Sequence, residues 1–136
     1  MSKNIRKRPD VTVKLILKYK DRILILKDKR GTITIPGGRM EWGESILGAL
    51  RRELKEELNY FLEEEPELFD IWNYISKDGE RHSVMIYFIK ELDKKLEFSS
   101  PEKLETLWLT KKEIVAMNMI KDRDFLDRIF YWKVKS

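Results

Sequence analysis

The stretch from Ser45 to Leu58 constrains the fold of this chain more than any other part of the sequence. Leucines recur there at spacings of three and four residues, the period of an amphipathic helix with one buried face. They are Leu47, Leu50, Leu54 and Leu58. On a helical wheel of about 100° per residue, Glu53, Glu56 and Glu57 cluster beside these leucines. The sequence therefore predicts a helix that packs on a core and carries acidic side chains at the border of its buried face.

The charges on this helix are sorted by face. Glu53 meets Glu56 and Glu57 three and four residues later, whereas an ordinary surface helix sets opposite charges at those offsets. Converging carboxylates repel one another unless a cation lies between them. A solvated face rich in lysine and glutamate explains the same spacing. From spacing alone, a cation site and a plain charged surface therefore stand as equal alternatives.

Composition limits the kind of cation such a site would take. The chain has no cysteine and a single histidine, His82, which excludes a disulfide scaffold, a thiol nucleophile, thiolate metal sites and multi-histidine sites. Oxygen ligands alone favour Mg²⁺, Mn²⁺ or Ca²⁺, and Mg²⁺ commonly completes its shell with water and substrate phosphates. Gly37 and Gly38, shortly before the helix, allow the close backbone approach that a phosphate needs.

The rest of the chain alternates between strand and helix signals. Val11–Tyr19 alternates apolar and polar residues and predicts a half-buried strand, and Ile23–Leu26, apolar on both faces, predicts a strand inside the sheet. Pro36-Gly37-Gly38 is expected to end regular structure. Further strands are expected over Thr32–Ile35, Leu68–Ile75, Ser83–Glu91 and Leu107–Leu109, and helices from Lys111 and over Asp122–Lys133. The class is α/β or α+β, with a central mixed sheet flanked by helices.

Length and charge suggest one domain with a short basic extension. The chain has 136 residues and a net charge of +4, which suits a single core over residues 10–136 after a basic tail over residues 1–9. Lys14 and Lys18 interrupt the first strand, so a signal peptide is not expected, and no apolar run is long enough to span a membrane. A cytoplasmic protein is therefore expected. The mild positive charge does not favour nucleic acid as a partner.

Eight positions fall in register with a known motif, in the pattern G-x5-E-x7-R-E-U-x-E-E-x-G-U, where U is a bulky apolar residue. They are Gly38, Glu44, Arg52, Glu53, Leu54, Glu56, Glu57 and Tyr60. The segment therefore resembles the Nudix box of the Nudix hydrolases. Asn59 stands where the family has glycine. Because that position ends the helix, a left-handed backbone is expected there, and asparagine is the next best residue after glycine.

The resemblance implies the Nudix α/β/α sandwich and hydrolysis of a pyrophosphate bond in a nucleoside diphosphate linked to another group, X. It also implies a cofactor, Mg²⁺ or Mn²⁺. Implied metal ligands are Glu53, Glu56, Glu57 and the Gly38 backbone carbonyl, with Glu102 and Glu105 as later candidates in the loop before Trp108. Implied catalytic residues are Glu53, Arg52 and Glu56, with Arg52 orienting Glu53. Glu44 and Asn59 are implied to be structural, although Glu44 also suits a simple favourable acid at a helix start.

The implied substrate is a small nucleotide. The expected substrate-binding residues are Gly37, Gly38, Arg39, Trp72 and Tyr74, although Trp72 and Tyr74, two apart on one strand face, suit a core equally well. Because sub-family signatures are missing, a nucleoside triphosphate is the expected substrate. A catalytically silent nucleotide-binding module and an RNA-directed, cap-like pyrophosphohydrolase remain as alternatives. The oligomeric state is open, with a homodimer among the options.

Overall fold

The computed structural model describes residues 7–134, so most of the basic tail expected over residues 1–9 lies outside the described residues. The strands are β1 (Asp10–Tyr19), β2 (Arg22–Lys27), β3 (Ile33–Thr34), β4 (Gly37–Arg39), β5 (Glu67–Ile75), β6 (His82–Glu91) and β7 (Glu105–Thr110). The helices are α1 (Ile46–Leu58), α2 (Lys111–Met117) and α3 (Arg123–Tyr131). No helix within residues 7–134 has the length and apolar character needed to cross a membrane.

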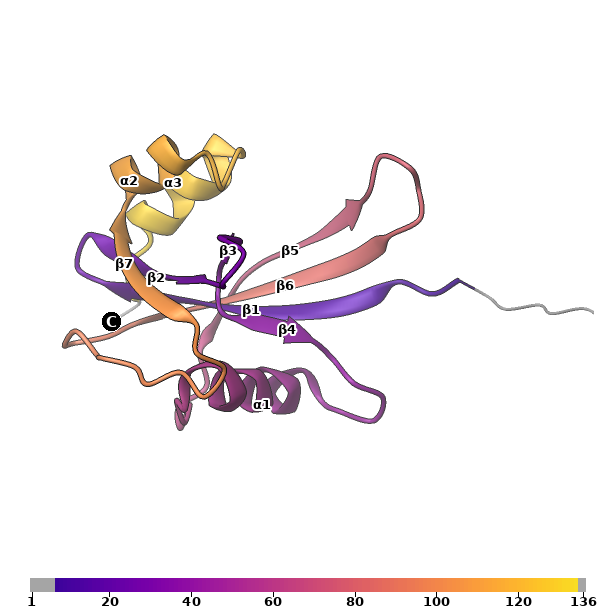
Figure 1. Ribbon diagram of the computed structural model, residues 1–136, viewed down its shortest axis with the longest axis horizontal. Coiled ribbons are helices and arrows are strands. Elements are labelled where there is room, and N and C mark those ends of the chain that lie inside the picture. Colours follow the sequence, from indigo (N-terminus) through magenta and orange to yellow (C-terminus); the bar gives the residue numbers. More distant parts are fainter. Residues whose placement is uncertain (1–6, 135–136) are drawn as a thin grey trace, which may run out of the picture.

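The strands form one mixed sheet in the order β3-β2-β1-β6-β5. The central strand β1 runs parallel to β6 and antiparallel to β2 and β4, while β7 pairs with β2 along its length. Helix α1 covers one face of the sheet, and α2 and α3 cover the other (Figure 1). The mixed sheet flanked by helices and the predicted α/β/α sandwich are therefore confirmed.

Two apolar clusters hold these layers together. Under α1, the predicted stripe is confirmed by the complete burial of Leu50 and Leu54 against Leu15 and Leu17 of β1. Under α2 and α3, a second apolar cluster, which includes Phe125, lies on the other face of the sheet. Both faces of β1 are thus covered, and the prediction of a half-buried strand is wrong, because helices distant in sequence cover the face that the alternation assigned to solvent.

The end of α3 is fixed to β1 by a buried lysine. The Nζ of Lys18 donates to the backbone carbonyls of Ile129, Phe130 and Trp132 at 3.0, 3.3 and 2.9 Å. These carbonyls lie at the C-terminal end of the helix, where the backbone dipole favours a cation. Burial lowers the pKa of Lys18. Lys18 lies on the face of β1 that the sequence pattern assigned to solvent, and its hydrogen bonds hold the end of α3 against the sheet.

Two segments differ from the sequence expectation in ways that affect the site. Gly37–Arg39 continues as β4 and pairs with Val13 and its neighbours in β1, so Pro36-Gly37-Gly38 does not end regular structure. Strand β7 begins at Glu105, opposite Lys27 of β2, so Glu105 lies in a strand and not in the preceding loop. Both differences arise because a neighbouring strand supplies backbone partners along the whole segment, which the local sequence does not reveal.

Helix α1 ends as the asparagine at its C-terminus predicts. Asn59 has φ 52° and ψ 35°; its N–H donates to the carbonyl of Lys55 at 2.9 Å, and the N–H of Tyr60 donates to the carbonyl of Leu54 at 3.3 Å. Since glycine adopts this left-handed conformation freely, Asn59→Gly is expected to change the free energy of unfolding by less than about 1 kcal/mol. Urea denaturation monitored by circular dichroism measures this. A loss several times larger would contradict the helix-end explanation.

Candidate active site

Arg52, in the middle of α1, is the centre of an ion-pair network. Its Nε and Nη2 donate to both carboxylate oxygens of Glu44, at 2.7 and 3.0 Å. Its Nη1 donates to Glu53 at 3.0 Å, and its Nη2 donates to the backbone carbonyl of Arg39 at 2.9 Å. Glu44 in turn accepts from the backbone N–H of Glu41. The bidentate contact is strong and directional, so Arg52 ties the loop before the helix, the end of β4 and the Glu53 carboxylate together.

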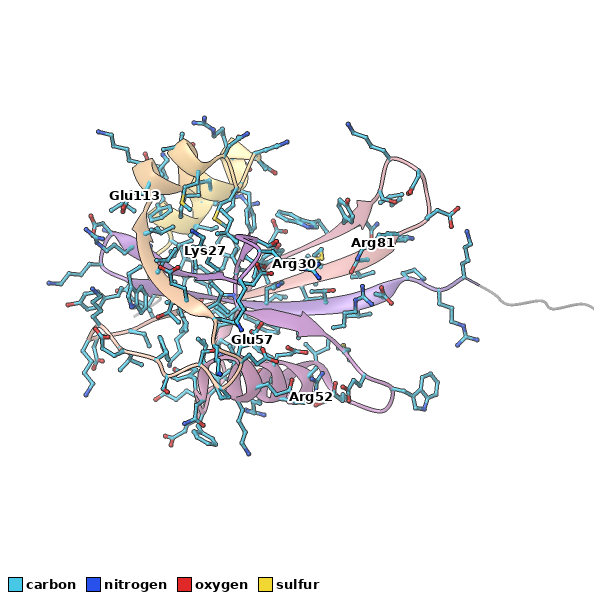
Figure 2. All side chains as sticks on the ribbon, in the orientation of Figure 1. Lys27, Arg30, Arg52, Glu57, Arg81 and Glu113 are labelled. Carbon is cyan, nitrogen blue, oxygen red and sulfur yellow. The ribbon has the colours of Figure 1, made fainter. Side chains whose placement is uncertain are left out.

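Glu57 lies on the inner face of α1, directed toward the sheet (Figure 2). Its side chain is buried, and one oxygen accepts the backbone N–H of Gly37 at 2.8 Å. Burial raises the pKa of Glu57, and the hydrogen bond from Gly37 and the charge of Lys14 oppose that rise. A carboxylate in this position is poorly solvated as an anion and would gain from a nearby cation.

Lys14 of β1 supplies a positive charge close to Glu57. The sequence alone did not predict a role for this lysine at the site. Its Nζ donates to the carbonyl of Ile35 at 2.9 Å, to the hydroxyl of Thr34 at 3.1 Å and to the carbonyl of Gly37 at 3.5 Å. Burial lowers the pKa of Lys14, while Glu57 and Glu53 raise it. A lysine inside an apolar strand was the only sign of this role in the sequence. Only the pairing of β4 with β1 brings Lys14 close to the glutamates.

Glu53 occupies the space that Gly38 leaves open. A Cβ added to Gly38 would lie 2.5 Å from the carboxyl carbon of Glu53, so any larger residue would displace that carboxylate. Burial raises the pKa of Glu53, Arg52 opposes this, and Glu56 and Glu102 raise it further. Glu102 also raises the pKa of Glu57. The fold thus brings Glu102 into the electrostatic neighbourhood of the helix glutamates, whereas Glu105 faces Lys27 within the sheet.

The donor chemistry of this cluster fits a divalent cation. The acidic side chains that converge between α1 and β4 offer oxygen ligands only, and neighbouring negative charges raise the pKa of Glu53 and of Glu57. Within residues 7–134, no three acidic or histidine side chains already form a metal-ligating group. Glu53 and Glu56 contact Arg52, and Glu57 contacts Gly37. Hard oxygen ligands of this kind suit Mg²⁺ or Mn²⁺.

The aromatic candidates separate into one core residue and one surface residue. The ring of Trp72 lies 4.3 Å from that of Phe125 and 5.0 Å from that of Tyr87, measured between centroids. These contacts make Trp72 part of the cluster under α3. Tyr74 is half exposed, at 54% of its surface, further along β5.

A hollow lies on the sheet face beside Lys14. Its volume is about 170 Å³, and it opens between β3, β6 and the segment that follows α2. Apolar side chains dominate its lining, with Lys14 as its charged member. Its residues are Lys14, Ile33, Thr34, Ile35, Met85, Tyr87, Met119 and Ile120. A small planar group beside a phosphate matches this combination of apolar walls and one cation.

The comparisons with known proteins agree with this architecture. A family model described as the NUDIX domain matches residues 6–131. The chain therefore belongs to the Nudix family. A solved structure, a MutT protein from Bacillus halodurans, superposes with a TM-score of 0.68 and 30% identity, covering 90% of this chain and 83% of that one.

Two curated relatives align with part of the chain. An uncharacterised Nudix hydrolase of Bacillus subtilis strain 168, YvcI, is 38% identical over 66 residues, or 48% of this chain and 41% of its own length. An ADP-ribose pyrophosphatase of Methanocaldococcus jannaschii is 31% identical over 88 residues, or 62% of this chain and 52% of its own. The matches span about half the length of these relatives or less, so they support the family and not a particular substrate.

Proposed function

We propose that this protein hydrolyses the pyrophosphate bond of a small nucleoside diphosphate derivative, with Mg²⁺ or Mn²⁺ as its cofactor. The observation that carries this proposal is the convergence of Glu53 and Glu57, both with raised pKa, on the Gly37–Gly38 backbone. Membership of the Nudix family and the ADP-ribose pyrophosphatase activity of the Methanocaldococcus jannaschii relative support the same proposal. A nucleoside triphosphate remains the proposed substrate.

Each residue of the cluster has a distinct proposed role. Glu53, Glu56 and Glu57 and the carbonyl of Gly38 would hold the cation, with Glu102 as a further ligand from the loop before β7. A bound divalent ion would neutralise phosphate oxygens and make a bound water more acidic. Arg52 holds the Glu53 carboxylate in place through its hydrogen bond. The exposed N–H and C=O groups allowed by the glycines would contact the diphosphate.

The hollow beside Lys14 is the proposed binding site of the nucleoside. Lys14 lines this hollow, and its charge also interacts with that of Glu57, so a base and ribose in the hollow would direct their phosphates toward the glutamates. Lys14 would then balance part of the phosphate charge. This arrangement assigns the substrate one defined orientation across β1.

A substrate panel tests the proposal directly. The protein would be incubated with nucleoside triphosphates, nucleotide sugars and dinucleotides, each with Mg²⁺, Mn²⁺ or EDTA, while phosphate and pyrophosphate release are measured. Turnover that requires the metal supports the proposal. Binding without turnover of any compound would instead identify a silent nucleotide-binding module. Activity confined to 5′-capped or triphosphorylated RNA would favour the RNA-directed alternative.

The pH dependence of metal binding gives a second test. Burial raises the pKa of Glu57. Above the ordinary glutamate pKa of about 4.3, the folded, metal-free protein therefore binds more protons than the unfolded chain. Its stability consequently falls as the pH rises toward the pKa of Glu57 in the folded state. A cation that competes with these protons removes that loss. The increase in Tm caused by magnesium over EDTA is therefore expected to grow from about pH 5 to about pH 8. Equal Tm shifts at both pH values would contradict this assignment.

A further inference from the structure

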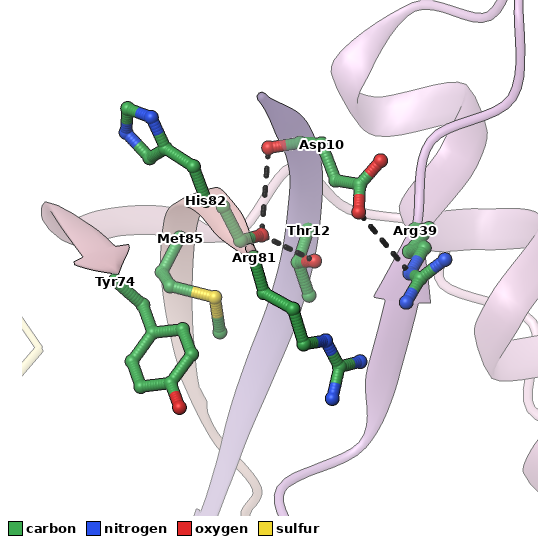
Figure 3. A pocket seen from close by; sticks show the side chains of 8 residues that line it. Asp10, Thr12, Arg39, Tyr74, Arg81, His82 and Met85 are labelled. Carbon is green, nitrogen blue, oxygen red and sulfur yellow. Dashed lines mark hydrogen bonds and ion pairs between the residues drawn. The ribbon is translucent and has the colours of Figure 1, made fainter. Parts of the chain in front are cut away.

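A second hollow lies on the same sheet face, at the other side of β4 from α1's acidic cluster. Its volume is about 200 Å³, and β1, β4, β5 and β6 all contribute to it. Its lining is polar where the first hollow is apolar. The residues are Asp10, Thr12, Arg39, Tyr74, Arg81, His82, Ser83 and Met85 (Figure 3).

Two arginines dominate the charge of this hollow. Arg39 approaches Asp10 at 3.7 Å, and within residues 7–134 the guanidinium of Arg81 makes no hydrogen bond or ion pair. The backbone of Arg81 is nevertheless fixed, because its N–H donates to the Ser76 hydroxyl at 3.0 Å in the β5–β6 turn. Figure 3 shows the His82 ring pointing away from the two guanidinium groups. The hollow therefore presents two arginine charges against one carboxylate.

The remaining lining completes a site for a phosphate-bearing group. The hydroxyls of Thr12 and Ser83 are hydrogen-bonded to each other at 3.1 Å, and their remaining lone pairs and protons add neutral polar groups to the lining. The phenol of Tyr74 and the thioether of Met85 form one wall. Guanidinium groups bind phosphate oxygens in pairs, with defined geometry. Aromatic and thioether walls suit the less polar remainder of such a ligand.

This hollow adjoins the proposed active site. Arg39 follows Gly38 directly in β4, and its carbonyl is held by Arg52. Met85 lines both this hollow and the one beside Lys14. A molecule with its nucleoside in the Lys14 hollow and its diphosphate at Gly38 would therefore extend toward Arg39 and Arg81.

We propose that the Arg39–Arg81 hollow binds a phosphate carried by the X portion of the substrate. This inference rests on the proposed function and narrows it. X is then a phosphorylated group, as in dinucleoside polyphosphates, and substrates whose X is an uncharged sugar are bound less well.

Binding of an inorganic anion tests the hollow without any turnover. Inorganic tripolyphosphate would be titrated by calorimetry into the full-length protein in EDTA, so that no metal holds the anion. Arg81→Met and Arg39→Met are each expected to weaken binding about tenfold, the usual effect of losing a charge-assisted contact. Lys77→Met removes an exposed cation from the same hairpin, outside the hollow, and should change the Kd less than about twofold. Unchanged binding in Arg81→Met, or an equal loss in Lys77→Met, would overturn the proposal.

Kinetics then test whether the hollow serves the substrate. With diadenosine tetraphosphate, Arg81→Met is expected to raise KM about tenfold with little change in kcat, because the lost contact is remote from the bond that breaks. With ADP-ribose, whose X is an uncharged sugar, KM should be nearly unchanged. An equal rise for both substrates would contradict the assignment. If the wild type cleaves neither compound nor any other nucleotide while anion binding still depends on Arg81, the proposed function fails and the anion site remains.

Discussion

Replacing Glu57 by glutamine is expected to abolish most turnover while leaving the fold intact. A bound metal supplies several kcal/mol of charge stabilisation, and each ~1.4 kcal/mol corresponds to about tenfold in rate, so kcat should fall roughly a thousandfold. The fold should survive because the amide oxygen of glutamine still accepts the Gly37 N–H that Glu57 accepts at 2.8 Å. Since burial already disfavours the charged form of Glu57, the metal-free variant should be at least as stable as the wild type.

The same variant separates a catalytic role from a structural one. In Glu57→Gln the Tm increase caused by magnesium should largely disappear, whereas Tm in EDTA should be unchanged or slightly higher. Glu65→Gln makes the same chemical change at an exposed position after the helix, and both kcat and the magnesium shift should stay at the wild-type level. Full activity with normal metal dependence in Glu57→Gln would refute the assignment of this carboxylate to the metal.

Local signals predicted the elements that carry the site. The leucine spacing located the buried face of α1, and Ser45 and Asn59, which cap its ends, marked its limits. The helix expected from Lys111 begins there, and Thr110 and Glu113 form both hydrogen bonds of a capping box at its start. These features depend on residues within one or two helical turns, so their physical cause is readable from a short stretch of chain.

Features that depend on distant segments were not predictable in the same way. The pattern predicts a surface position for Lys14 on an alternating strand, yet its Nζ is partly buried against Ile35 and Gly37, and its charge interacts with the glutamates of α1. Lys18 shows the same pattern under α3. Trp72 and Tyr74 share one strand face, but only the packing of Phe125 against Trp72 distinguishes a core ring from an exposed one. Each case required knowledge of which element covers which face of the sheet.

Gly37→Ala is expected to be the most destabilising single change in the site. An added Cβ at this position would lie 2.0 Å from the carbonyl oxygen of Val13 and 2.7 Å from the Cα of Lys14. Both are backbone atoms of β1, so no side-chain rotation relieves the overlap. Gly37 also has φ 132°, which other residues rarely adopt. Steric overlap and backbone strain together should lower the free energy of unfolding by about 4 kcal/mol, measured by urea denaturation.

Gly43→Ala distinguishes these two causes, because Gly43 also has a positive φ, 87°, but an added Cβ would meet nothing within 4 Å. Its expected loss is only the strain of a left-handed residue, about 1 to 2 kcal/mol. The excess loss in Gly37→Ala then measures the contact between β4 and β1. Because the Gly37 N–H binds Glu57, that variant should also lose the Tm increase caused by magnesium, which Gly43→Ala should retain. Similar losses of stability in the two variants would show that β4 can move away from β1 at little cost in free energy. The close approach of the Gly37 backbone to β1 would then not be what holds the glutamate site in place.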